Sequence, residues 1–351
     1  MSEIDIIEGL QKAINHIHLT EGEAGKIMRD IMTGNVTSAQ LGAFLTALAI
    51  KGESIEEITG FARVMREFAN RIQPQVKGDL LDTCGTGGDS LKTFNISTIT
   101  ALVVAGVGVP VAKHGNRAVT SKCGSADLLE GLGVNINLDP EGVKNCIEKV
   151  GIGFMFAPLF HPAMKHAMPT RRELKIRTVF NILGPLTNPA NAKCHILGVF
   201  KKELAPVMAK VLKILDASHV FTIHNSCGID EIAPVGINYI TEYHNGKLET
   251  YAVTNEDFNL PKCSINKILA GNLEENLKIA VGILKNHQNG AKFNTVLMNS
   301  SLALKSANMA NDFQEAVSIA RNSIESGKAY EKLEHLIEVS GGDNSKLENL
   351  K

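Results

Sequence analysis

The sequence has no excess of charge of either sign, because 36 lysines and arginines balance 37 aspartates and glutamates over 351 residues. Proteins that bind nucleic acids neutralise many phosphates and usually carry a clear basic excess. The net charge of −1 therefore argues against nucleic acid as a partner. It leaves room for one local positive site, because net charge does not describe a single pocket.

Paired cysteines and a secretory signal are also missing. No two of the six cysteines have the CxxC spacing that structural zinc sites use. The acidic start, Met1–Asp5, is not a signal peptide. Scattered cysteines without a signal are typical of reduced thiols, and we therefore expect a cytoplasmic protein.

Long apolar runs are absent as well. The most apolar stretch, at about residues 99–112, is shorter than the roughly 20 residues that a membrane-spanning helix needs, and it contains glycines and a proline. This composition predicts a buried helix followed by a buried strand, and no membrane as a partner. The chain is long enough for two domains and a sizeable core.

The start of the chain, as far as residue 73, predicts a small helical bundle. A first helix is indicated at residues 4–14 by apolar residues spaced three and four apart. Three later helices each begin with a capping box, in which a hydroxyl residue precedes a Glu or Gln by three positions. These pairs are Thr20 with Glu23, Thr37 with Gln40, and Ser54 with Glu57.

From residue 80 onward, short apolar runs alternate with helical patterns, which is typical of an α/β sheet. Asn245-Gly246 separates two further runs and predicts an antiparallel hairpin with a type I′ turn. The sheet is therefore expected to be mixed and mainly parallel. Strands are expected at residues 80–82, 109–112, 134–138, 152–156, 195–200, 219–223, 239–243 and 248–253.

The segment 162–189 interrupts this pattern, because it is rich in proline and basic residues. We expect its helical part to pack on the N-terminal bundle, which makes the helical domain discontinuous. The predicted domains are residues 1–73 with about 162–190, and residues 74–161 with 191–351. A cleft between two domains is a common place for a small-molecule site.

The first motif with chemical meaning is Gly85–Asp89, with the sequence GTGGD, directly after a strand. Its glycines let the backbone turn N–H groups toward a ligand, and the helix expected from Asn95 adds a positive dipole end. By itself the motif fits equally well a strand–turn–helix corner without a ligand. Two other nucleotide motifs are excluded, because Lys92 does not follow a glycine and Ser90 breaks the GxGxxG spacing.

Two further motifs add to the first. Lys113–Arg117 (KHGNR) follows a predicted strand, where Lys113 and Arg117 can neutralise phosphate. The adjacent carboxylates Asp230 and Glu231 are typical magnesium ligands when a phosphate shares the metal, although most such pairs are only solvated surface groups.

In this order, the motifs resemble the anthranilate phosphoribosyltransferase family over nearly the whole chain, together with Gly124–Asp127, Arg171–Leu174 and Phe180–Pro189. The resemblance implies the fold of nucleoside phosphorylases and phosphoribosyltransferases, with a small helical and a larger α/β domain, and a homodimer. It also implies an activity in tryptophan biosynthesis. The enzyme would transfer a 5-phosphoribosyl group from phosphoribosyl pyrophosphate to the amine of anthranilate, giving N-(5-phosphoribosyl)anthranilate and pyrophosphate.

The resemblance further implies roles for single residues. The donor phosphoribosyl pyrophosphate would contact Gly85, Gly88, Asp89, Thr93, Asn95, Ile96, Ser97, Thr98, Lys113, His114, Gly115, Asn116, Arg117, Ala118, Val119, Thr120, Ser121 and Ser125. The acceptor anthranilate would contact Gly85, Asn116 and Arg171, and Mg²⁺ would bind Ser97, Asp230 and Glu231. Catalytic roles would fall to Lys113, His114 and Asp89, with His114 either a base or a hydrogen-bonding loop residue.

Three alternatives stay open. A pyrimidine nucleoside phosphorylase of the same fold would need its own Lys- and Ser-rich signature, where Lys113–Asn116 stands instead. A relative that binds nucleic acid would need basic surfaces. A phosphate-binding regulatory protein would keep the glycine loop but need no acceptor site.

Overall fold

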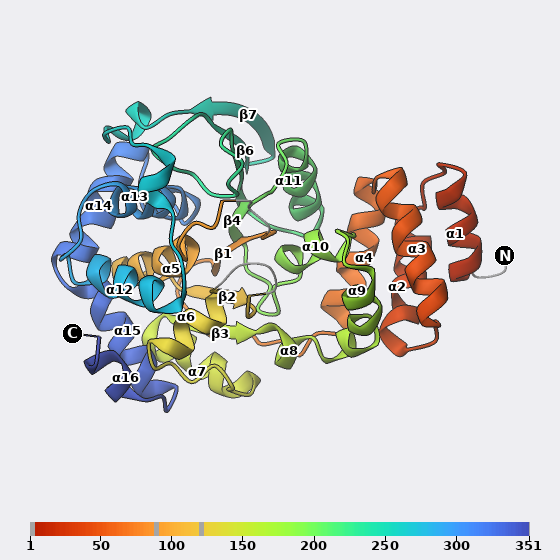
Figure 1. The fold of residues 1–351 in the computed structure, drawn as a ribbon, viewed down its shortest axis with the longest axis horizontal. Helices are drawn as coiled ribbons and strands as arrows, with labels where there is room; N and C mark the ends of the chain where they lie inside the picture. The colour runs from red at the N-terminus through yellow and green to blue at the C-terminus, as the bar shows by residue number, and fades with distance from the viewer. Residues whose placement is uncertain (1–3, 88–90, 119–122, 351) are drawn as a thin grey trace.

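The computed structural model describes residues 4–87, 91–118 and 123–350. A bundle of the first four helices stands at one end of the molecule, beside a larger unit built on a twisted sheet (Figure 1). The strands are β1 (Leu81–Gly85), β2 (Val111–Gly115), β3 (Ile152–Phe156), β4 (Cys194–Gly198), β5 (His219–Asn225), β6 (Asn238–His244) and β7 (Lys247–Val253). The helices are α1 (Ile6–Ile14), α2 (Glu21–Thr33), α3 (Ser38–Lys51), α4 (Ile55–Glu67), α5 (Ile96–Val107), α6 (Ser125–Gly131), α7 (Pro140–Val150), α8 (Ala157–Phe160), α9 (Met168–Leu174), α10 (Phe180–Leu183), α11 (Leu204–Ile214), α12 (Leu273–Leu284), α13 (Ala291–Ser306), α14 (Phe313–Glu325), α15 (Lys328–Val339) and α16 (Asn344–Glu348).

The bundle helices begin where their capping residues stand. The three predicted capping boxes are confirmed at α2, α3 and α4, with both reciprocal hydrogen bonds present in each. A fourth box, which the sequence analysis did not identify, starts α1 with Asp5 and Glu8. These caps satisfy early N–H groups that a helix cannot satisfy internally.

A buried ion pair joins the turns at the end of the bundle. Lys51 Nζ lies 2.7 Å from a Glu57 carboxylate oxygen, and the two side chains are 2% and 0% exposed. Glu57 also accepts hydrogen bonds from the Leu19 and Ser54 N–H groups. Burial by itself raises the pKa of Glu57, but the hydrogen bonds from Leu19, Lys51 and Ser54 outweigh it and hold the pKa below its usual value.

The sheet has the order β3-β2-β1-β4-β5-β6-β7. The first five strands in this order are parallel, whereas β6 and β7 add antiparallel neighbours. The mixed, mainly parallel sheet is therefore confirmed. The hairpin is confirmed too, because Asn245 and Gly246 have φ values of 50° and 82°, as a type I′ turn requires.

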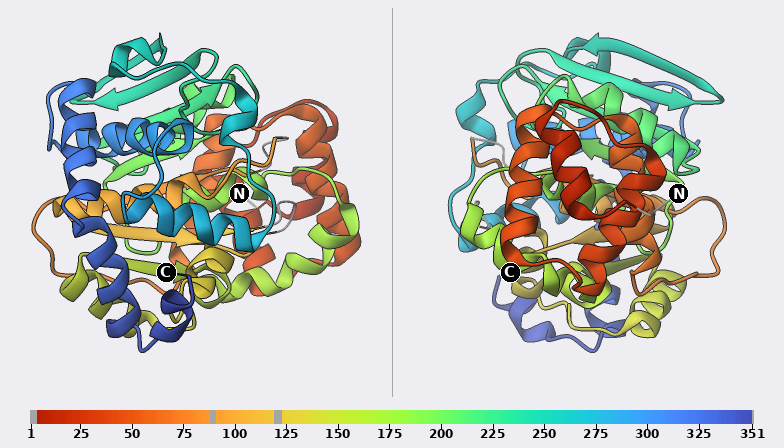
Figure 2. Two further views of the ribbon diagram at one scale, coloured as in Figure 1. Left: turned by 60° about the vertical axis from the view of Figure 1, so that its left-hand side comes forward. Right: turned by 90° about the vertical axis from the view of Figure 1, so that its right-hand side faces the viewer.

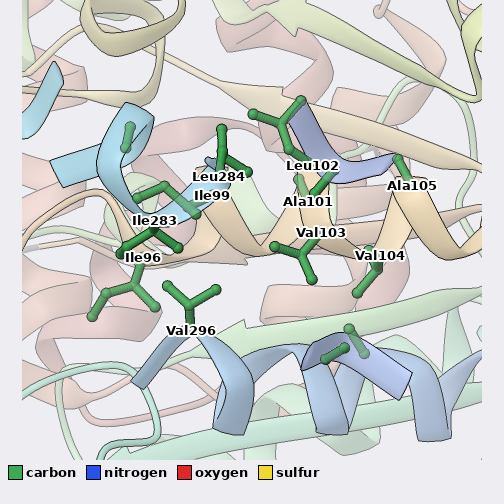
Figure 3. Close-up of a cluster of buried hydrophobic side chains, with 14 of the residues drawn as sticks. Ile96, Ile99, Ala101, Leu102, Val103, Val104, Ala105, Ile283, Leu284 and Val296 are labelled. Carbon is green, nitrogen blue, oxygen red and sulfur yellow. The ribbon is translucent and has the colours of Figure 1, made fainter. Parts of the chain in front are cut away.

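Side chains of alternate residues in the strands enter different cores. On β4, Ile196 belongs to the cluster beneath α5, whereas Leu197 belongs to the cluster shared with α11 and the bundle. The predicted buried helix is α5, whose side chains pack on all sides, against Ile283 and Leu284 of α12 and Val296 of α13 (Figure 3). A helix enclosed in this way gives its N-terminus a fixed position.

Two sequence predictions of strands need correction. The strand expected at 134–138 was wrong, because this segment belongs to none of the strands and is held by the C-terminal helices. Asn135 bonds Ser340 through both its N–H and its side chain. The strand expected at 109–112 begins at Val111 instead, since Pro110 has no N–H to donate to a ladder.

The proline-rich segment returns to the bundle, as expected. α9 packs against α3, where Gly42 faces Thr170 and Leu174. Arg66 of α4 then joins the bundle to the other unit, donating to the carbonyl oxygens of Leu186 and Leu215 at 2.7 and 3.2 Å. The right-hand view of Figure 2 shows the bundle in front of the sheet. Where the domains are divided along the chain stays a prediction.

No helix within the described ranges is long and apolar enough to cross a membrane.

We expect Glu57→Ala to lower the free energy of unfolding by roughly 3–5 kcal/mol, because Lys51 would stay buried without its partner. Urea denaturation at pH 7 measures this, with the exposed neighbour Glu56→Ala as the control. Since the folded pKa of Glu57 lies below the usual value of 4.5, its stabilisation is present above that pH and is lost as the pH falls further. Equal losses in the two variants would contradict the role of the pair.

Candidate active site

The centre of the sheet is a topological switch point. From β1 the chain moves outward to β2 and β3 on one side, and later to β4 and β5 on the other. The carboxyl ends of β1 and β4 therefore open a crevice between diverging connections, which is where open α/β sheets bind ligands. The glycine loop begins there, at Gly85.

An acidic loop after β5 closes this crevice. Asp230 Oδ2 accepts a hydrogen bond of 3.1 Å from the Gly87 N–H. Glu231 Oε1 accepts one of 3.2 Å from the Ser97 N–H, and Thr93 Oγ1 lies 3.4 Å from Glu231 Oε2. The structure thus brings together the glycine loop, the start of α5 and the acidic pair. The positive end of the α5 dipole favours carboxylates at this position.

Two glycines allow this close approach. A Cβ atom on Gly198, at the end of β4, would lie 1.5 Å from the Asp230 carbonyl oxygen. One on Gly85 would lie 2.7 Å from Asp230 Oδ2. The sequence motif points to Gly85 but not to Gly198, because nothing in the local sequence of Gly198 reveals a contact with a loop 32 residues away.

The N-terminus of α5 is held from a distance. Asn95 is the N-cap residue, but its side chain does not cap the helix. Instead, Asn276 of α12 accepts hydrogen bonds from the Asn95 N–H and Nδ2, at 3.1 and 3.2 Å. Ile96 and Thr98 are buried, so the segment 95–98 lines the crevice mainly through its backbone and Ser97.

Lys113 lies beneath the start of α5 rather than at the surface. Its side chain is buried, and Nζ donates to the Thr83 carbonyl oxygen at 2.6 Å and to Ser97 Oγ at 3.2 Å. Burial lowers the pKa of Lys113, while the nearby Asp82 opposes this shift. Burial likewise raises the pKa of Asp82, which is fully enclosed. The amino group of Lys113 is therefore fixed beneath the crevice, against Thr83 and Ser97.

His114 forms a pair with His161, which the sequence analysis did not single out. Their ring centroids lie 5.0 Å apart, and both side chains are buried. Burial lowers the pKa of His114 to about 3 and that of His161 to about 4. Both imidazoles are therefore neutral at pH 7. Such a group can donate or accept a hydrogen bond but does not hold a proton for transfer.

The loop after β2 is organised by its own carboxylates. Arg117 pairs with Asp127 and Glu130, with the closest distance 2.7 Å to Glu130. Asp127 also accepts from the Ala118 N–H at 2.9 Å. Ser125 Oγ donates to the Asn116 carbonyl oxygen at 3.3 Å. In this structure, Arg117 therefore stabilises the loop after β2 through these two ion pairs.

Arg171 lies on α9, next to α10. Its guanidinium carbon stands 5.2 Å from the centroid of the Phe180 ring, and burial lowers its pKa. Within the part of the chain that the structure describes, no carboxylate forms an ion pair with Arg171. A half-buried guanidinium without a counter-charge is suited to an anionic ligand.

Five predicted site residues, Gly88, Asp89, Val119, Thr120 and Ser121, lie outside the described residues.

A second cluster of metal-ligand types lies at the other end of β5 and β6. His219 Nε2 is 2.9 Å from Glu242 Oε1, and His244 completes the group. However, the rings of His219 and His244 are stacked at 3.9 Å with planes only 2° apart. Their lone pairs therefore lie in parallel planes and do not converge on one ion, so this cluster is not a chelate in its present form.

Comparisons with known proteins agree with this geometry. Residues 7–69 match the helical bundle domain of a glycosyl transferase family, and residues 77–330 match its a/b domain. An anthranilate phosphoribosyltransferase of Chloroflexus aurantiacus is 48% identical over 341 residues, covering 97% of this chain and all of that protein. One of Acetivibrio thermocellus is 50% identical over 335 residues, covering 94% and 96%.

Solved structures show the same similarity. The anthranilate phosphoribosyltransferase of Thermus thermophilus has a TM-score of 0.89 and 42% identity, covering 95% of this chain and 99% of its own. That of Saccharomyces cerevisiae, solved in complex with PRPP and Mg, has a TM-score of 0.88 and 28% identity, covering 96% and 98%.

Proposed function

This chain belongs to the anthranilate phosphoribosyltransferase family, and we propose from that premise which of its residues perform the transfer. The enzyme transfers the 5-phosphoribosyl group of phosphoribosyl pyrophosphate to anthranilate, a step of tryptophan biosynthesis. The observation that carries the proposal is the convergence of the glycine loop, the α5 N-terminus and the acidic pair at one switch point.

The donor phosphates would bind at this switch point. Backbone N–H groups of the loop from Gly85 and of the segment 95–98 present partial positive charge. Lys113 lies beneath Ser97 and would add positive charge there. The other predicted donor contacts, Gly115, Asn116, Arg117, Ala118 and Ser125, come from the end of β2, the loop after it and the start of α6. Val119, Thr120 and Ser121, which lie outside the described residues, would complete this set, as the resemblance implies. Asp89 would act near the donor, as the resemblance implies.

The donor set at the acidic pair fits a magnesium ion. Asp230, Glu231 and the Ser97 hydroxyl offer oxygen ligands only, which is what Mg²⁺ prefers, and they lie beside the proposed phosphate site. When bound, the ion would neutralise negative charge that develops on the pyrophosphate leaving group. This chain's own contribution is to hold the carboxylates in place against Gly87 and Ser97.

The acceptor site follows from charge and position. Arg171 would fix the anthranilate carboxylate through its planar fork, with Asn116 and Gly85 contacting the same ligand. The aromatic amine attacks C1 from the face opposite to pyrophosphate, so the C1–O bond breaks as the C1–N bond forms. Pyrophosphate leaves with the bonding electrons, and the nitrogen then loses one proton to pyrophosphate or to water. Because the amine is already neutral, no strong base is needed. We assign His114 a hydrogen-bonding role. Positioning of the amine against C1 is the second contribution to the rate, after the neutralisation of charge on the leaving group.

Homodimerisation is proposed from the outer face of the bundle. An apolar groove of about 490 Å³ runs between α1, α3 and α9. Ile14 and Ile50 line it and are 62% and 75% exposed. Exposed apolar patches of this kind commonly mark protein interfaces.

We also propose a cytoplasmic location, because no disulfide is present among the described cysteines.

We predict that Arg171→Ala raises the KM for anthranilate about 10- to 100-fold, since a charge-assisted bidentate hydrogen bond would be lost. The KM for phosphoribosyl pyrophosphate should stay nearly constant. Steady-state assays that follow loss of anthranilate fluorescence measure both constants. Arg172→Ala, the exposed neighbour on α9, is the control. Equal effects of Arg171→Ala on both substrates would rule out its assigned role.

For the acidic pair, we predict that Asp230→Asn with Glu231→Gln lowers kcat roughly 100-fold and weakens its dependence on magnesium, because the charges that hold the cation would be lost. A magnesium titration of kcat measures this. Glu256→Gln with Asp257→Asn, an exposed acidic pair after β7, is the matched control. An unchanged titration would exclude Asp230 and Glu231 from the metal site.

For the bundle face, we predict that Ile50→Asp converts a dimer into a monomer, since a buried unpaired charge is costly in an apolar interface. Sedimentation velocity over a range of concentrations measures the change. Met309→Asp places a charge at another exposed apolar residue, 43% exposed, and should leave the dimer intact. A wild-type protein that sediments as a monomer would contradict the proposal at the outset.

A further inference from the structure

A small enclosed cavity lies directly beneath the acidic pair. Its volume is about 10 Å³, which is close to the space that one water molecule requires. The polar residues in its wall are Thr83, Ser97, Thr100, Asp230, Glu231 and Asn299. All of them except Asn299 belong to the central strands, to α5 or to the acidic loop.

Asn299 reaches the cavity from α13, and its orientation is fixed by its partners. Its Nδ2 donates to the Ile232 carbonyl oxygen at 2.7 Å and to the Thr295 carbonyl oxygen at 2.8 Å. Carbonyl oxygens only accept hydrogen bonds, so the reversed amide would place oxygen against oxygen. The amide nitrogen must therefore face these carbonyls, which leaves Oδ1 as the group of this cavity-lining side chain that can take another partner.

This oxygen is an acceptor for which the rest of the structure provides no donor. The Asn299 side chain is 3% exposed, and within residues 4–87, 91–118 and 123–350 no hydrogen bond to its Oδ1 is present. Thr100 Oγ1, in the same wall, is buried and has no hydrogen-bond partner among the described residues. Buried polar atoms are normally satisfied by protein or by ordered water. A buried unpaired hydroxyl in the wall of a cavity of this size, beside an amide oxygen to which no described group donates, points to a bound water.

We propose that Asn299 is a positioning residue of the cation site. Through Nδ2 it holds the loop immediately after Glu231, and through Oδ1 it accepts a hydrogen bond from a water ordered beside Asp230 and Glu231. Magnesium retains several of its waters in protein sites, so a polar pocket next to its carboxylates is where such a water is needed. The inference deepens the proposed function and rests on the acidic pair binding the cation.

The test measures cation binding rather than activity alone. Mn²⁺ is titrated by electron paramagnetic resonance in the presence of saturating inorganic pyrophosphate, with circular dichroism to establish that each variant is folded. Asn299→Ala removes both polar groups. Asn299→Leu keeps the side-chain volume and serves as the second variant if alanine impairs folding. Ser300→Ala, at the next buried position of α13, is the control for disturbance of the core.

We expect both Asn299 variants to raise the Mn²⁺ dissociation constant about 10-fold or more, as loss of groups behind metal ligands does elsewhere. Ser300→Ala should match the wild type, and the KM for anthranilate should not change. If Asn299→Leu binds Mn²⁺ like the wild type, or Ser300→Ala weakens binding equally, the polar role of Asn299 is overturned.

The Asp230→Asn, Glu231→Gln double variant separates this inference from the function on which it rests. If the double variant loses Mn²⁺ while the Asn299 variants keep it, only the role of Asn299 fails. If the double variant retains Mn²⁺ with wild-type affinity, the assignment of the acidic pair fails, and the inference about Asn299 fails with it.

Discussion

The site depends on one contact, the docking of the acidic loop onto the glycine loop and the start of α5. Asp230 and Glu231 accept hydrogen bonds from the Gly87 and Ser97 N–H groups. The contact is possible only because Gly198 has no side chain where the Asp230 carbonyl oxygen passes. Any larger residue there would push the loop away from the strand ends, and the carboxylates would leave the crevice.

Because of the same contact, the carboxylates compete with the donor phosphates for backbone N–H groups. Backbone N–H groups of a glycine loop and of a helix start attract any anion, and in this structure the carboxylates use one of each, those of Gly87 and Ser97. A phosphorylated donor needs the same kind of N–H group. In the proposed function, a divalent cation resolves this competition, because it attracts the carboxylates and the phosphates together. In the same proposal, Lys113, whose Nζ is fixed beneath Ser97, would assist from below the helix start.

The sequence predicted those structural features that depend on residues close together in the chain. The capping boxes, the strand at 152–156 and the Asn245-Gly246 turn depend on residues within a few positions of each other, and all were confirmed. The strand expected at 134–138 was wrong, because its hydrogen-bonding groups are taken by Ser340, about two hundred residues later. Apolar alternation alone does not distinguish a paired strand from an extended segment packed under helices.

The candidate site divides in the same way. Its motifs were visible because glycine, hydroxyl and acidic residues are unusual in such runs. The residues that support those motifs could not be recognised in the sequence, because they act through contacts between distant elements. They are Gly198, His161, Asn276 and Asn299. The sequence also could not show that Lys113 is buried, since a lysine after a strand is as often exposed.

In the proposed function, the groups that bind the donor and the charge that binds the acceptor carboxylate stand on different parts of the molecule. The donor groups stand on the strands and on α5, which the core encloses on all sides. Arg171, proposed for the acceptor, stands on α9, which packs on α3 of the bundle. The position of Arg171 relative to Ser97 therefore depends on how the bundle is joined to the sheet. Arg66 maintains that junction through two carbonyl oxygens, and although burial lowers its pKa to about 10, it stays charged at neutral pH. In the proposed function, the hold on the acceptor carboxylate thus rests on the junction, whereas the chemistry of the leaving group rests on the sheet.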